Sequence, residues 1–468
     1  MSTAFPFSLP DRRLDRKILT LYLLAAGLFY VAVVGYLVGE GKRIPSMIAL
    51  GAPALLYLIT QPRLALYSFI FLVTIKNDVM PSIPITAADI GALLLIASAG
   101  FDFLLNSSAE VKFPPLTVNY LSLLGILVVA GIFGYSFSLS LHPIARILLL
   151  FLTFLALHHA LSRVSLIKPV KFFFWLVAAH SVIAFGQFAA NGGHIRSFGL
   201  IQDMLDDFTM ITLPVGVALF LWERQKGMRY LIGSMITLAG LVATQSRAPM
   251  LFAALAVIIV FWVSRRRATQ PDHQFVRRRI RTFLFAAAGL AALALVLKPG
   301  LFGAFTDRFQ RLITTTPGDT FRLRLVIWSR ALSVFAAHPL LGLGPGTFRF
   351  YSDIFPSAHL DSVGYYIRSL SAHNLTLHYL AETGLTGTVA LLALFVNVFR
   401  KGRSIWIRET RPDYFPLALA LFIVATLFMY TTPLEAGWMW GETSYAAVFF
   451  FGLIARGSQQ LGGQQENT

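Results

Sequence analysis

Apolar stretches long enough to cross a lipid bilayer recur along nearly the whole chain of 468 residues. A transmembrane helix needs roughly 17–25 predominantly apolar residues, and about fourteen stretches approach that length. The first, at 18–38, follows a basic N-terminal segment and is too long for the apolar part of a signal peptide, so we expect an uncleaved span. The others lie near 44–60, 64–75, 85–105, 116–134, 143–161, 170–190, 207–222, 229–244, 249–264, 282–298, 384–399, 415–431 and 443–455. The sequence therefore predicts an all-α membrane protein with about 12–14 transmembrane helices.

Composition agrees with a membrane-embedded chain. Hydrophobic residues make up 56% and charged residues 13%, whereas soluble domains have roughly 45–50% and about 25%. The chain has no cysteine, which excludes disulfides, thiolate catalysis and Cys-ligated zinc. A net charge of +17 is also found in nucleic-acid-binding proteins. Here the basic residues form short blocks between apolar stretches, so we expect no nucleic-acid partner.

The basic blocks also predict the orientation. Most of the 39 Lys and Arg residues occupy alternate connections, starting with the N-terminal segment. Since cytoplasmic loops carry the excess of basic residues, both termini are expected in the cytoplasm and the protein in the bacterial inner membrane. The predicted organisation is an N-terminal bundle of about eleven spans at 1–298, a periplasmic loop at 299–374, C-terminal spans at 375–457 and a polar cytoplasmic tail at 458–468.

The predicted periplasmic loop is rich in aromatic residues and is unlike a disordered linker. Residues 321–337 are expected to form an amphipathic helix lying on the membrane, ended by His338-Pro339. The residues that recur at helical spacing are Leu323, Val326, Ile327, Arg330 and Val334. A turn-rich segment with Gly342, Gly344, Pro345 and Gly346 follows. A second helix is expected to begin near Ser371 as N-cap and to run through His373 into the next span.

Chemistry on the outer face requires a donor that carries its own leaving group, because that compartment has no nucleotide pool. A lipid diphosphate sugar is such a donor, and it needs cations for the diphosphate and a base for the acceptor hydroxyl. Arg196 and Arg247 fall at the outer ends of two spans, and a planar guanidinium matches phosphate oxygens. The alternative is that each arginine snorkels or pairs with a carboxylate. The nearby carboxylates are Asp203, Asp206 and Asp207.

His373 is the candidate base, because an imidazole titrates near neutral pH; the alternative is a histidine with a purely structural role. His378 and Glu382 are four residues apart and share another helix face, so they are expected to pair with each other as supporting residues. The three aspartates near position 205 have no accompanying histidine cluster and suit a helix N-terminus, so no metal is expected.

Several motifs, taken together, resemble the bacterial O-antigen ligase and O-antigen polymerase superfamily. Thr244-Gln245-Ser246-Arg247-Ala248 resembles its Ser-Arg motif, and Arg196-Ser197-Phe198-Gly199 is similar to its upstream arginine motif. The outer loop contributes Arg322-Leu323-Arg324, Trp328, His338-Pro339-Leu340-Leu341-Gly342-Leu343-Gly344-Pro345-Gly346, Ala372-His373-Asn374 and Leu380-Ala381-Glu382-Thr383-Gly384-Leu385-Thr386-Gly387. The chain departs from the family pattern after Arg196, where it reads Gln202-Asp203-Met204-Leu205-Asp206-Asp207.

The resemblance implies a GT-C type glycosyltransferase that uses an undecaprenyl diphosphate-linked glycan and needs no metal or other cofactor. It implies that His373 is the catalytic base and that Arg247 and Arg196 hold the diphosphate, with Arg322 and Arg324 supporting it or anchoring the loop. The acceptor would be a lipid A-core, which makes a ligase, or another lipid-linked glycan, which makes an O-antigen or exopolysaccharide polymerase. A protein acceptor is a further alternative. Membrane lipids and a polysaccharide assembly complex are the further expected partners.

Two other classes of protein remain as alternatives. A polysaccharide transporter or lipid-glycan flippase has a similar number of spans, but it predicts paired intramembrane charges and repeated halves, and the sequence has neither pattern. A scaffold protein for polysaccharide assembly would make His373 and Arg247 dispensable.

Overall fold

The computed structural model describes residues 53, 55–75, 78–80, 83–105, 113–191, 195–200, 204–268, 270–297, 320–350, 372–431 and 441–460. The chain divides into two compact units, 1–61 and 62–468. In the first unit, residues 55–60 are helical. The predicted span at 18–38, most of the one at 44–60 and most of the polar tail lie outside the described residues.

The second unit consists mainly of helices, as the sequence predicts. Nine of the described helices are long and apolar enough to cross a membrane, and α3 and α5 are apolar but shorter. A short antiparallel hairpin, β1 (Asp78–Met80) with β2 (Ile83–Thr86), precedes α4 and was not predicted. The helices are α3 (Pro62–Val73), α4 (Ala87–Leu105), α5 (Thr117–Phe133), α6 (Phe137–Leu161), α7 (Ile167–Ala190), α8 (Leu205–Trp222), α9 (Gly227–Thr244), α10 (Arg247–Arg267), α11 (Gln270–Leu297), α13 (Thr320–Ala337), α16 (Leu375–Arg408), α17 (Phe415–Thr431) and α18 (Gly441–Gln460). The all-α polytopic fold is confirmed.

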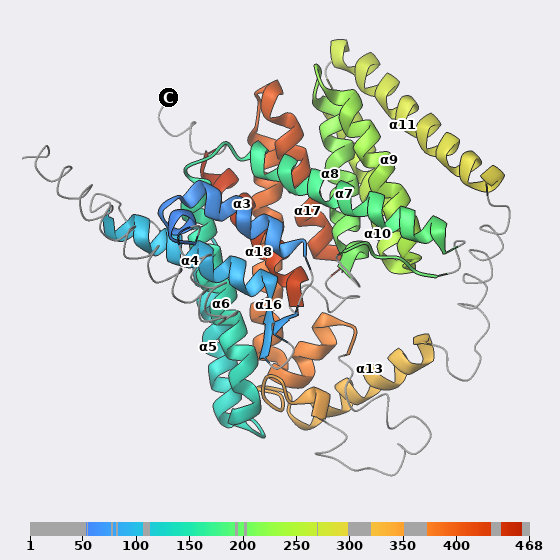
Figure 1. The fold of residues 1–468 in the computed structure, drawn as a ribbon. Helices are drawn as coiled ribbons and strands as arrows, with labels where there is room; N and C mark the ends of the chain where they lie inside the picture. The colour runs from blue at the N-terminus through green and yellow to red at the C-terminus, as the bar shows by residue number, and fades with distance from the viewer. Residues whose placement is uncertain are drawn as a thin grey trace, which may run out of the picture. The chain divides into compact units, whose positions relative to one another are not determined.

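Two groups of helices lie against α16 and α17. Helices α7, α8, α9 and α10 pack together, and α8 also contacts α17 (Figure 1). Helix α8 is buried along almost its whole length, because it is apolar all round and has neighbours on every side. Helices α3, α4, α6 and α18 form the other group, while α5 packs against both α6 and α16.

Helix α6 begins six residues earlier than predicted, and Pro143 lies inside it. Proline has no N–H to donate to the carbonyl four residues earlier, here that of Leu139. Gly346 of the turn-rich segment packs against this carbonyl so closely that a Cβ at Gly346 would lie 2.7 Å from the oxygen. The start of α6 therefore lies against the turn-rich segment.

Helix α16 is broken at Gly384, which has φ +61° and ψ −158°. The carbonyls of Ala381 and Glu382 therefore lose their donors in the helix, and they accept hydrogen bonds from Leu343 N (3.0 Å) and Gly344 N (2.8 Å) instead. On the other side of the break, Leu385 N donates to the carbonyl of Pro339 (2.8 Å). The turn-rich segment thus replaces the missing turn of the helix, which satisfies backbone groups that would be costly to leave unpaired in a bilayer.

We predict that Gly384→Ala destabilises the fold, because a Cβ at Gly384 would lie 2.4 Å from the backbone carbon and oxygen of Leu340 and the φ is positive. The expected loss is at least about 1–3 kcal/mol, measured as a lower unfolding temperature in detergent. Gly125→Ala is the control, because a Cβ there meets no atom within 4 Å. Equal unfolding temperatures for the two variants would contradict the proposed role of the break.

Candidate functional site

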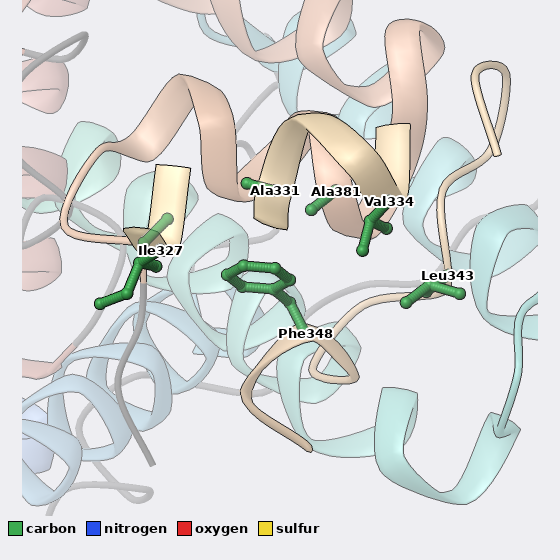
Figure 2. Packing of buried hydrophobic residues seen from close by; sticks show 7 residues of the cluster. Ile327, Ala331, Val334, Leu343, Phe348 and Ala381 are labelled. Atoms are coloured by element: carbon green, nitrogen blue, oxygen red, sulfur yellow. The ribbon is translucent and has the colours of Figure 1, made fainter. Parts of the chain in front are cut away.

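A small apolar core joins α13, the turn-rich segment and α16. The ring of Phe348 lies among Ile327, Ala331 and Val334 of α13, with Leu343 and Ala381 beside them (Figure 2). The predicted helix at 321–337 is present as α13, and one of its faces packs against the protein. Ile327 and Val334 are buried against the protein, because the break in α16 holds the turn-rich segment under them.

Glu382 fixes the shape of the turn-rich segment. Its carboxylate accepts hydrogen bonds from the backbone N–H groups of Gly346 (2.8 Å) and Phe348 (3.1 Å). The Nε2 of His378 lies 3.3 Å from Oε2 of Glu382, and both side chains are buried. The pairing of His378 with Glu382 expected from their spacing is therefore present. Because Glu382 also binds the backbone of the turn-rich segment, the His378–Glu382 pair connects this segment to α16.

His373 lies before α16 rather than inside it, which corrects the sequence-based expectation. The N-cap of α16 is Asn374, whose side chain accepts a hydrogen bond from Leu377 N (3.0 Å); Ser371, the expected cap, lies outside the described residues. His373 has φ +47°, a left-handed conformation that is uncommon for a non-glycine residue and is often found at functional sites. The indole of Trp328 donates to the carbonyl of Ala372 (2.8 Å) and so ties α13 to this turn.

The surroundings of His373 favour a neutral imidazole. Its pKa is lowered below the ordinary value, first by burial and then by the positive charge of Arg324 and by His378. A cation beside an imidazole disfavours protonation. Arg324, predicted as a diphosphate ligand, therefore contributes to the lowered pKa of His373. For Arg322 only the backbone position, in the first turn of α13, is described.

The second cluster lies at the N-terminus of α10. Gln245 links α9 to α10 with φ +52°, Ser246 is the N-cap, and Arg247 is the first helical residue. Arg196 donates to Oγ of Ser246 (2.6 Å) and to the carbonyl of Thr244 (2.9 Å). Two arginines therefore meet at one helix N-terminus, where the backbone N–H groups and the helix dipole also favour an anion.

The anchoring role of Ser246 was not predicted from the sequence. Its hydroxyl forms no cap hydrogen bond to α10 and instead binds Arg196 and the side chain of Asp206. Asp206 and Asp207 lie in the first turn of α8, as expected, and Asp203 is outside the described residues. A serine directly before the first arginine of a span was the available signal, because it marks an N-cap.

Arg247 is the first residue of α10 and lies next to Ser246. It is half-buried, and no hydrogen bond or ion pair to it occurs within the described ranges. Likewise, among the residues whose placement is described, no hydrogen bond joins either Arg196 or Arg247 to His373. The contacts thus define two clusters, one at the start of α10 and one at the start of α16. Across the described part of the chain, no three His, Asp or Glu side chains are grouped to hold a metal.

One further polar group, outside the two clusters, links three helices. Asp89 of α4 forms an ion pair with Arg146 of α6 and accepts a hydrogen bond from the hydroxyl of Tyr445 on α18 (2.5 Å). The ring of Tyr445 also lies 4.5 Å from the Arg146 guanidinium carbon. Three helices distant in sequence are joined here, and neither helical periodicity nor local spacing predicts such a contact.

Comparison with known families agrees with this geometry. Residues 232–392 match the family model described as O-antigen ligase, and this range contains the Ser246-Arg247 cap, α13, His373 and Glu382. The match confirms the resemblance to the O-antigen ligase and polymerase superfamily that was drawn from the motifs, and it covers this part of the chain. It supports a membrane glycosyltransferase of the O-antigen ligase kind in general. No curated protein matches the chain.

We predict that Glu382→Ala destabilises the protein, since it leaves the buried N–H groups of Gly346 and Phe348 without their acceptor. Each unpaired buried donor costs about 1–3 kcal/mol, so a clear drop in unfolding temperature is expected in detergent. Glu223→Ala is the control, because it removes a half-exposed carboxylate whose side chain pairs with Lys171. A Glu382→Ala protein as stable as the control would show that the carboxylate does not hold the segment.

Proposed function

We propose that this protein is a membrane glycosyltransferase that moves a glycan from undecaprenyl diphosphate to an acceptor hydroxyl on the periplasmic face. The observation that carries the proposal is the meeting of Arg196 and Arg247 around Ser246 at the N-terminus of α10, partly inside the O-antigen ligase domain. The neutral imidazole of His373 supplies the second requirement, a base.

The arginines and the helix N-terminus stabilise the leaving group. As the bond between the anomeric carbon and the diphosphate oxygen breaks, the electron pair stays on the diphosphate and its negative charge rises at that oxygen. Donors fixed in advance around developing charge stabilise a transition state more than mobile water does. Arg196 is fixed by two hydrogen bonds, and Arg247 has a guanidinium that is available to phosphate oxygens.

His373 activates the acceptor. Its unprotonated ring nitrogen takes the hydroxyl proton as the acceptor oxygen forms its bond to the anomeric carbon. Attack opposite to the leaving group inverts the anomeric configuration and puts the base and the diphosphate on opposite sides of the sugar. Two separate clusters, one cationic and one holding a neutral imidazole, suit this arrangement better than one mixed cluster.

The acceptor decides between two forms of this activity. With lipid A-core it is an O-antigen ligase, and with another lipid-linked glycan it is an O-antigen or exopolysaccharide polymerase. A polysaccharide transporter or lipid-glycan flippase is the second candidate, favoured by the buried Asp89–Arg146 ion pair in α4 and α6. However, this ion pair is completed by a tyrosine hydroxyl and is explained equally well as a structural link between helices. It therefore does not favour a transporter over the transferase, and the transferase is preferred.

The test replaces each proposed group and follows the glycan. In membranes that receive lipid-linked glycan, His373→Ala is expected to lower transfer by about 10²–10⁴-fold, and Arg247→Gln by about 10²–10³-fold, with donor accumulating. His338→Ala and Arg349→Gln are the controls, because both side chains are exposed on the same segment of the chain. Unchanged transfer in His373→Ala would refute the base, and transport without transfer would favour the flippase.

We also predict a pH effect of Arg324. Because His373 acts in its neutral form, the rate should fall as pH falls through its pKa, which burial and Arg324 hold below the ordinary value. Arg324→Gln removes one of the causes that lower the pKa, so the acidic limb of the pH–rate profile should move to higher pH. Arg349→Gln should leave the limb in place. A limb at the same pH in Arg324→Gln would contradict the assignment of His373 as the titrating base.

A further inference from the structure

A cavity of about 720 Å³ lies between the ends of α4, α6 and α18, a volume typical of ligand pockets. Most of its wall is apolar, with Ile96 and Phe103 from α4, Leu152 and Leu155 from α6, and Phe113 from the segment before α5. Neither the arginine cluster nor His373 takes part in it.

The cavity and the candidate transfer site lie at opposite ends of α6. At the start of the helix, Tyr135 N donates to the carbonyl of Leu343 (2.7 Å), and Gly346 packs against Leu139. At its end, His158 and His159 line the cavity. Helix α6 has 25 residues, and at about 1.5 Å per residue it spans the thickness of a bilayer. The cavity is therefore at the other membrane boundary, which the charge pattern predicts to be cytoplasmic.

Two polar side chains in the cavity wall each have one buried nitrogen with no hydrogen-bond partner among the described residues. His158 is only 7% exposed, and its Nε2 is buried with no hydrogen-bond partner among the described residues. The Nε of Arg456, at the end of α18, is also buried with no hydrogen-bond partner among the described residues. The Nη1 of Arg456 lies 3.5 Å from Oε1 of Gln459. A buried donor without a partner costs free energy, so a guest with acceptor oxygens would be stabilised here.

The carboxylate that pairs with His159 of the cavity wall does not repel such a guest. Asp102 of α4 pairs with His159 (2.5 Å) and with Arg163 (2.7 Å), so its negative charge is compensated. With Arg456 also present, the polar end of the cavity has an excess of positive charge, while the rest of the wall is apolar.

We propose that this cavity binds an anionic phospholipid of the cytoplasmic leaflet. The headgroup phosphate accepts hydrogen bonds from Arg456 and His158, and an acyl chain lies along Phe103, Leu152 and Leu155. Basic pockets between transmembrane helices on the cytoplasmic side are suited to anionic lipids, and the apolar wall favours a lipid over free phosphate. Bound lipid would hold together α4, α6 and α18, the helices that the Asp89–Arg146–Tyr445 group joins nearer the other boundary. This inference does not depend on the transferase proposal.

The first test fills the cavity. Gly100 lines it, and a Cβ at Gly100 meets no atom within 4 Å, so Gly100→Trp places an indole in the cavity without a backbone clash. Gly186→Trp is the matched control on α7, where a Cβ also meets nothing within 4 Å. Phosphatidylglycerol is expected to raise the unfolding temperature of the detergent-purified wild type and of Gly186→Trp in a saturable manner, and to have little effect on Gly100→Trp.

The second test removes the charge and separates the ligands. Arg456→Gln should weaken the apparent affinity for phosphatidylglycerol roughly fivefold, whereas Arg265→Gln, at an exposed arginine at the end of α10, should not. Phosphatidylcholine and inorganic phosphate at the same concentrations should give no stabilisation. Equal stabilisation by phosphatidylcholine, stabilisation by phosphate alone, or an unchanged response in both Gly100→Trp and Arg456→Gln would overturn the proposal.

Discussion

The contact between the broken helix α16 and the turn-rich segment before it is the constraint on which the candidate site depends. A break in a membrane-embedded helix exposes carbonyl and N–H groups that lipid cannot satisfy. Here Leu343 and Gly344 donate to the carbonyls freed by the break at Gly384, and the carboxylate of Glu382 binds the next N–H groups along the segment. Helix α13 then packs on the segment through Phe348.

Through this packing the break also positions His373. Trp328 of α13 binds the carbonyl of Ala372, and Asn374 starts α16 immediately afterwards. The imidazole is thus held in a left-handed turn between two fixed residues, with Arg324 near enough to disfavour its protonation. At the other cluster, Gln245 also has a positive φ, and it lies two residues before Arg247. Both proposed functional groups therefore lie on turns whose conformation the neighbouring helices impose.

Hydropathy predicted nearly every described helix, because a membrane span has a strong and local signal in the sequence. The helix at 320–337 was also predicted from its spacing. The start of α16 was not predicted correctly, since Ser371 and Asn374 are both acceptable N-caps and only the fold selects one.

The candidate site could likewise be predicted only in part from the sequence. Residue types indicated Arg196, Arg247 and His373 as candidates. However, the binding of Arg196 to Ser246 joins residues 50 positions apart, and the pairing of Asp89 with Arg146 joins residues 57 positions apart. Such contacts depend on packing between helices and leave no periodic pattern.

The central claim is that a diphosphate binds at the N-terminus of α10 while the sugar it carries faces His373. An experimental structure of the full chain with a lipid diphosphate-linked glycan, determined on a variant that lacks the base, tests it directly. The account predicts both phosphates within hydrogen-bond distance of the guanidinium groups of Arg196 and Arg247, and the anomeric carbon between them and position 373. Phosphates bound elsewhere, or an anomeric carbon turned away from position 373, would contradict it.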